Sequence, residues 1–211
     1  PLPPPQKVIH SAFYEARPDV HAVMHNHSRA CMGVSCLSDG LEYLTQDGAG
    51  FFGKVSYHGW EGLSDDAEEK ANLAWNLGPA PKHTLIMRSH GAAVVGGSVG
   101  QAWVRNYYLD RICQVQMDLL PAIAKDTELR TGSRRLGDRL IVYPAKHVLR
   151  HAAKQIDQDF SHGKFEWAAL LREAKRLELT RLWFAFSRDA ARSCSSSSGG
   201  GGGGGGRAGC S

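Results

Sequence analysis

Apolar residues recur at helical spacing over several stretches of the chain, and these stretches predict its helices. The first stripe comprises Ile9, Ala12, Phe13 and Ala16, at steps of three and four residues. Arg17-Pro18 ends this helix, because the residue before a proline avoids the helical conformation. Further helices are predicted over residues 28–37, 64–77, 99–120, 146–158 and 164–178. Pro121 weakens or ends the fourth of these predicted helices.

Short apolar runs without helical spacing predict strands between the helices. They cover residues 20–27, 41–44, 84–88, 92–95 and 140–143. The run 84–88 predicts a central strand, because a strand that is apolar on both sides needs cover on both faces of its sheet. Residues 46–62 hold five glycines among aromatic residues and indicate loop and short strand, with His58 exposed in the loop. Alternation of helices and strands over short connections favours an α/β fold.

Three histidines close two of the predicted strands. His25 and His27 end the strand 20–27, and because side chains alternate along a strand, both leave it on the same face. His90 follows the strand 84–88. If these strands are neighbours, three imidazoles surround one point, which is the ligand number of a catalytic zinc site with an open position. The chain has ten histidines, so an ordinary role for each of the three stays open at the level of spacing.

Composition limits the class of protein. The chain has 211 residues, of which 42% are hydrophobic, enough for one domain with a real core. It contains no apolar run of about 18 residues, so no membrane span is predicted. Its five cysteines include no Cys-x-x-Cys pair, which favours free thiols in a reducing, cytoplasmic setting. The chain shows no signal-peptide pattern and opens on Pro1, so we expect its natural start to lie upstream.

Charge is distributed unevenly along the chain. Residues 1–124 carry a net charge of −3 and residues 125–192 a net charge of +6. Acidic residues interleave with the basic ones in the second region, which favours solvated helical surface over a nucleic-acid site. Residues 193–211 are rich in serine and glycine and predict a disordered tail, because such a segment has no apolar surface to bury.

Two blocks of sequence resemble the class II aldolase/adducin family. The first comprises HSAFY at residues 10–14 and ARPDVHAVMHNHS at residues 16–28. The second comprises MRSHG at residues 87–91 and GGSVGQAW at residues 96–103. Arginine-proline-aspartate, His-x-His and His-Gly at these separations are specific for the family, and the resemblance covers residues 6–120.

The resemblance implies a fold, a metal and a chemistry. The fold is a three-layer α/β/α sandwich around a mixed, largely antiparallel sheet. His25, His27 and His90 match the family's three metal-binding histidines, which usually hold zinc. The metal polarises a carbonyl so that an enediolate can form, and carbon–carbon bonds of small phosphorylated sugars are cleaved or made. Family members are commonly tetramers with sites at subunit interfaces, whereas adducin heads keep the fold as non-catalytic cytoskeletal modules.

The chain departs from the aldolase pattern at three places. Gln6 stands where the aldolases have a glutamate that serves as base, and a neutral amide accepts no proton at neutral pH. The phosphate-binding loop and the first strands of the family lie upstream of Pro1, so we expect a fragment with an unpaired sheet edge. Ser89 stands where the enzymes often have asparagine before His-Gly.

Two functions are carried forward from these observations. The first is a metal-dependent lyase, of the aldehyde-lyase type, acting on a small sugar phosphate or keto acid. The alternative is a catalytically silent, adducin-like module that binds actin, another cytoskeletal protein or another protein partner. Both predict a cytoplasmic homo-oligomer, a tetramer by the resemblance, with no nucleic-acid partner. The predicted parts are a family domain at residues 1–120, a helical extension at 121–192 and the tail at 193–211.

Overall fold

The computed structural model describes residues 4–62, 67–131, 141–159 and 163–177, and the side chains of residues 4–6, 67, 124, 126–131 and 159 are left out of the description. Two compact units, residues 1–167 and 168–211, are distinguished, and the sheet lies in the first. The predicted tail at 193–211 lies outside the described residues, as does Leu140 of one predicted strand. The division at residue 120 stays a prediction. No helix within the described ranges is long and apolar enough to cross a membrane.

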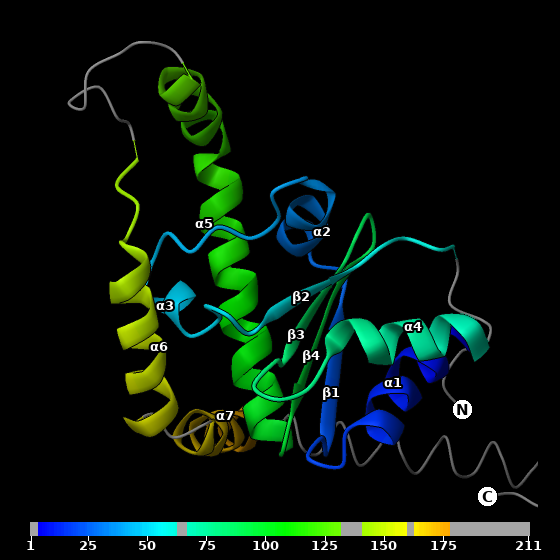
Figure 1. The fold of residues 1–211 in the computed structure, drawn as a ribbon. Helices are drawn as coiled ribbons and strands as arrows, with labels where there is room; N and C mark the ends of the chain where they lie inside the picture. The colour runs from blue at the N-terminus through cyan, green and yellow to red at the C-terminus, as the bar shows by residue number, and fades with distance from the viewer. Residues whose placement is uncertain (1–3, 63–66, 132–140, 160–162, 178–211) are drawn as a thin grey trace, which may run out of the picture. The chain divides into compact units, whose positions relative to one another are not determined.

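Four strands form one mixed sheet in the order β1-β4-β3-β2 (Figure 1). They are β1 Ala22–Asn26, β2 Val55–His58, β3 Thr84–Met87 and β4 Gly91–Gly96. β4 pairs antiparallel with both β1 and β3, and β2 pairs parallel with β3. The prediction of a mixed, largely antiparallel sheet is therefore confirmed. The central position of β3 is confirmed as well, and all four of its residues are buried.

Seven helices are found among the described residues. They are α1 Pro4–Ala16, α2 Arg29–Cys36, α3 Gln46–Ala49, α4 Ala67–Leu77, α5 Val99–Thr131, α6 Lys146–Asp159 and α7 Lys164–Arg176. α5 continues through Pro121, where we expected it to weaken or end. The physical reason is that one missing backbone hydrogen bond leaves the turns on either side of a 33-residue helix intact.

Two predicted strands are absent from the structure. Residues 41–44 have no strand partner, because side chains satisfy their backbone: Leu41 N donates to the Tyr57 hydroxyl and Glu42 N to Gln116 Oε1, at 3.0 and 2.8 Å. Residues 141–143, the described part of the predicted strand 140–143, are irregular as well. Short apolar runs thus indicated burial correctly at Leu41 and Ile141, but not strand pairing.

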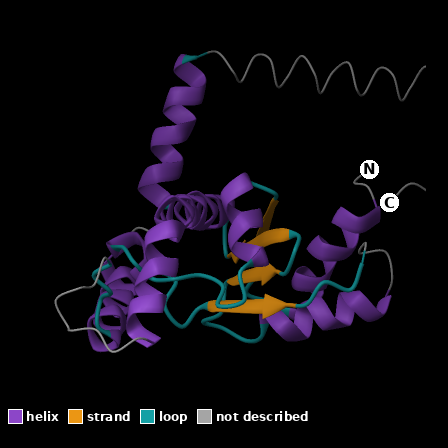
Figure 2. Cartoon of the chain, turned by 90° about the horizontal axis from the view of Figure 1, so that it is seen from above, coloured by secondary structure: helices purple, strands orange, loops and turns teal. Residues whose placement is uncertain are grey.

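Helices cover both faces of the sheet (Figures 1 and 2). On one face, α2 and α5 pack over buried residues that include Val34, Val94 and Leu109. On the other face, α1 and α4 pack over a second buried set that includes Phe13, Leu73 and Val95. Neighbouring residues of β4 thus enter opposite cores, as strand alternation requires. The three-layer α/β/α architecture is confirmed.

The register of the strands gives the sheet two chemically different ends. Asn26, His58, Met87 and Gly91 lie together at what we call the histidine end. Ala22, Val55, Thr84 and Gly96 lie together at the opposite end. At about 3.3 Å of rise per residue, strands of this length separate the two ends by roughly 10 Å or more.

Candidate metal centre

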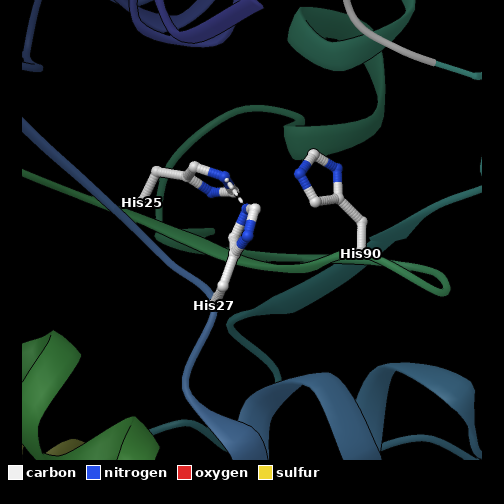
Figure 3. A group of neighbouring side chains, drawn as sticks. All are labelled: His25, His27 and His90. Atoms are coloured by element: carbon white, nitrogen blue, oxygen red, sulfur yellow. Dashed lines mark hydrogen bonds between the residues drawn. The ribbon is translucent and has the colours of Figure 1, made fainter.

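His25, His27 and His90 gather at the histidine end, with one ring nitrogen of each lying within 4.8 Å of those of the other two. Figure 3 shows the three rings turned toward one common point. The ring centroids are 4.6–5.0 Å apart, and the rings meet edge to face. His27 is exposed, and the other two are half-buried. The predicted strands 20–27 and 84–88 are not neighbours, because β4 lies between β1 and β3. His90 still reaches the other two histidines, because it directly precedes β4, the strand that pairs with β1.

The turn between β3 and β4 brings His90 to this point. Gly91 begins β4 so close to β1 that a Cβ atom there would collide with the carbonyl oxygen of Asn26. Ser89 adopts the left-handed backbone conformation at φ 57°. Asparagine tolerates that conformation better than serine, which gives a backbone reason for the asparagine that aldolases often have before His-Gly.

A backbone contact fixes which nitrogen of His25 is available. Nδ1–H of His25 donates to the carbonyl oxygen of Ala92 at 3.1 Å, which leaves Nε2 with its lone pair. Nε2 of His27 lies 2.7 Å from that atom and donates to it. Metal-binding histidines in proteins are commonly oriented by a hydrogen bond from the ring nitrogen that does not bind the metal, as the Nδ1–H of His25 makes to Ala92.

Burial favours the uncharged form of two of the three imidazoles, those of His25 and His90. Burial first, and then the neighbouring His27 and His90, lower the pKa of His25 to about 4. Burial also lowers the pKa of His90, with His27 and His58 adding to the effect. His25 and His90 therefore release no proton at neutral pH when a cation binds. Three imidazole nitrogens gathered in this way are a ligand set that suits zinc, whose bonds to histidine nitrogen are about 2.0–2.1 Å long.

Polar contacts hold the end of β1 in place. Asn26 Nδ2 donates to Asn106 Oδ1 on α5, and Asn26 Oδ1 accepts the backbone N–H of Ser28 at 3.1 Å. Ser28 in turn caps α2, which begins within the helix predicted over residues 28–37, by accepting the N–H of Cys31 at 3.1 Å. The strand that carries His25, and the residues that lead from it through His27, are thus tied to helices on one face of the sheet.

Gln6 lies in the first turn of α1, and its side chain is outside the described residues. His10, one turn further along α1, is near enough to His25 for its charge to lower the pKa of that residue. Burial lowers the pKa of His10 itself. α1 therefore runs past the histidine cluster, but the place of the Gln6 amide in the site stays a prediction.

His58 is the residue that sequence reasoning misplaced. It ends β2 and is 3% exposed, whereas we expected an exposed loop residue. Its Nδ1 accepts from Asn76 Nδ2 at 3.0 Å, and its Nε2 lies 4.0 Å from Glu69 Oε1. The sequence did carry a signal for this strand, because apolar Val55 and Tyr57 alternate with polar Ser56 and His58. The glycines around this short alternation obscured it. A buried His58-Glu69 pair thus lies at the same sheet end as the cluster.

Comparison with known proteins identifies the family. Residues 2–117 match the model of the Class II Aldolase and Adducin N-terminal domain. A Pseudomonas aeruginosa protein assigned to aldolase class 2 is 39% identical over 109 residues, covering 52% of this chain and 41% of that protein. Rat alpha-adducin is 38% identical over 112 residues, covering 53% of this chain and 15% of its own length. The chain thus spans less than half the length of these relatives.

Solved structures agree with the sequence matches. An aldolase II superfamily protein from Pseudomonas syringae superposes with a TM-score of 0.65 at 33% identity, over 80% of this chain and 62% of its own. L-fuculose 1-phosphate aldolase from Glaciozyma antarctica superposes with a TM-score of 0.59 at 26% identity, over 81% of this chain and 57% of its own. Sequence and fold together place the chain in the class II aldolase and adducin family.

Proposed function

We propose that this chain belongs to a metal-dependent enzyme in which His25, His27 and His90 hold one divalent cation, zinc. The observation that carries the proposal is the convergence of three ring nitrogens within 4.8 Å of one another. The backbone contact of His25 and the low pKa of its buried ring support the same conclusion, because both keep a neutral nitrogen available.

The proposed reaction class is carbon–carbon lyase chemistry on a small sugar phosphate or keto acid. A bound divalent ion would polarise a substrate carbonyl and make loss of a neighbouring proton easier. Among this chain's residues, His25 and His90 hold the ion from half-buried positions, and His27 completes the set at the solvent-exposed side. Similarity to an L-fuculose 1-phosphate aldolase supports this class of substrate.

Gln6 favours a second candidate function. An amide at the position of the aldolase base cannot take a proton at neutral pH, so a lyase would need another acceptor. The match to alpha-adducin is of the same quality as the match to the aldolase class 2 protein. The alternative is therefore an adducin-like module that binds actin or another cytoskeletal protein. In both proposals the chain works in the cytoplasm as a homo-oligomer, a tetramer.

Elemental analysis of the purified protein tests the metal proposal. We expect about one zinc per chain in the wild type and at least about tenfold less in His25→Ala and His90→Ala, because three ligands leave no redundancy. His147→Ala, at an exposed position on α6, serves as the matched control and keeps the metal. A folded wild type without metal, or variants that retain it, would reject the site.

Activity assays then separate the two functions. A metal-loaded protein that cleaves a sugar phosphate or keto acid supports the lyase. A metal-loaded protein that is inactive on both substrate classes but co-sediments with actin filaments supports the module. The His90→Ala variant is the control in each assay, because only the lyase requires the ion.

A further inference from the structure

A cavity of about 310 Å³ lies at the sheet end opposite the histidines. Lys54 directly precedes β2, His83 directly precedes β3 and Gly96 ends β4, and all three line it. Four cationic side chains line this cavity, namely Arg17, Lys54, Lys82 and Arg105, against two carboxylates, Asp19 and Asp157. We call it the cationic cavity. None of the metal-site histidines lines it.

Two of the four cationic side chains, Arg17 and Lys82, are engaged by hydrogen bonds within the protein. Arg17 binds both oxygens of Asp19, at 2.7 and 2.6 Å. Its remaining nitrogen donates to the carbonyl oxygens of Gly78 and Lys82, at 2.9 and 3.0 Å. The ammonium group of Lys82 donates to the carbonyl oxygen of Val55 at 2.6 Å. Arg17 and Asp19 thus neutralise each other, and Arg17 has a structural role.

Arg105 is different, because most of its donors are unused. Within the described part of the chain its guanidinium donates to one acceptor, the carbonyl oxygen of Val95 at 2.5 Å, although the group carries five N–H donors. Burial lowers the pKa of Arg105 to about 10, so it remains charged at neutral pH. Arg105 is half-buried, and the nearby carboxylates of Asp157 and Asp19 offset part of its charge without accepting hydrogen bonds from it among the described residues. The unused N–H donors of this guanidinium are therefore available to an anion that enters the cavity.

Two further side chains that line the cavity can contact an anion together with Arg105, namely the cationic Lys54 and the neutral Gln101. The side chain of Lys54 is 7% exposed, and its ammonium group binds Asp157 Oδ1 on α6 at 2.6 Å. Asp157 itself is half exposed, at 51%. The Gln101 side-chain oxygen accepts the backbone N–H of Gly97 at 2.7 Å, which leaves its NH₂ group as a donor.

We propose that the cationic cavity binds a small phosphate group, as inorganic phosphate or a phosphate monoester, through Arg105, Lys54 and the Gln101 amide. The flat, forked guanidinium matches phosphate oxygens with two parallel hydrogen bonds, which favours Arg105 as the main contact. Asp157 is the internal counterion that competes with the ligand for Lys54. The site is separate from the metal centre and does not depend on the proposed lyase function.

Isothermal titration of the full chain with inorganic phosphate tests this proposal. The wild type is expected to bind saturably at one site. Arg105→Met should weaken binding at least about tenfold, because it removes the main charge partner. Arg111→Met, an exposed arginine on the same helix that does not line the cavity, is the matched control and should leave binding unchanged.

Asp157→Asn gives a result of opposite sign. It removes the competing carboxylate and should tighten phosphate binding several-fold, an effect that damage to the fold would not produce. Because Asp157 is half exposed, this variant also remains informative if Arg105→Met fails to fold.

Three outcomes would overturn the proposal. They are no saturable binding by the wild type, phosphate binding that is unchanged or weaker in Asp157→Asn, and phosphate binding that is lost in His25→Ala, which would assign the ligand to the metal centre. A titration with succinate distinguishes the ligand class. Weaker binding of succinate than of phosphate supports the phosphate site, and equal or tighter binding assigns the cavity to carboxylates instead.

Discussion

The two ends of one sheet show two ways of arranging nitrogen donors. At the histidine end, three imidazoles converge, and burial lowers the pKa of His25 and His90 so that these rings carry no charge. At the opposite end, the nitrogens belong to arginine and lysine and are charged, and carboxylates and backbone carbonyls surround them. Neutral donors with lone pairs suit a cation, and charged N–H donors suit an anion. The same strands thus present opposite chemistry at their two termini.

The histidine end depends on the close approach of β4 to β1 at Gly91, and Gly91→Ala should disrupt this approach. The added methyl group collides with the backbone oxygen of Asn26, where neither partner can move without displacing a strand. We expect a loss of about 3 kcal/mol in the free energy of unfolding, with loss of bound metal in the same protein.

Urea titration and elemental analysis measure the two effects of Gly91→Ala. Gly59→Ala is the matched control, because a Cβ atom at that exposed position meets nothing within 4 Å. Wild-type stability together with full metal content in Gly91→Ala would show that the close strand approach does not position His90.

Arg17→Met sharpens the distinction between structural and ligand-binding cations at the opposite end. It leaves Asp19 unpaired and removes the donor shared by the carbonyl oxygens of Gly78 and Lys82. We expect a loss of about 2 kcal/mol in unfolding free energy, measured by urea titration, while phosphate binding changes less than in Arg105→Met. Arg29→Met, on the exposed side of α2, is the control. Undiminished stability in Arg17→Met would contradict its structural assignment.

The pH dependence of stability gives the smallest expected effect. Burial first, and then the charges of Arg105 and Lys54, hold the pKa of His83 well below its usual value. Below about pH 6.5 the unfolded chain therefore gains a proton at His83 that the folded chain does not, so stability is complete above that pH and falls as the pH is lowered. Between pH 7.5 and pH 5 this residue accounts for at most about 2 kcal/mol.

Comparison of variants isolates the contribution of His83. His83→Gln should lose less stability than the wild type between pH 7.5 and pH 5, as measured by urea titration at each pH. The substitution His147→Gln, at an exposed position, should leave the acid sensitivity as in the wild type. Equal acid sensitivity in His83→Gln and the wild type would show that this imidazole is not held uncharged.

Local sequence determined most of the elements and the residues of the candidate metal site. The stripe from Ile9 to Ala16, the Ser28 cap and the alternation that places His25 and His27 on one face depend on near neighbours only. The family resemblance grouped His90 with them, and in the structure His90 reaches them because it directly precedes β4, the strand next to β1. The spacing of the histidines along the chain could not by itself bring His90 beside the other two, because the order of strands depends on contacts between distant segments.

Tertiary contacts decided the features that spacing could not predict. The brief strand expected at 41–44 did not form because the side chains of Tyr57 and Gln116 satisfy that backbone. His58 is buried because α4 covers the end of β2, and its glycine-rich surroundings had suggested the opposite. The cationic cavity joins residues from positions 17 to 157, and although Arg17, Asp19 and Gln101 lie in the family's sequence blocks, no spacing along the chain predicted that they line one cavity. The charge of a titratable side chain depends on the atoms that are close to it in space. The sequence therefore determined which nitrogen-bearing side chains are present, and only the packed structure determined their protonation and their neighbours.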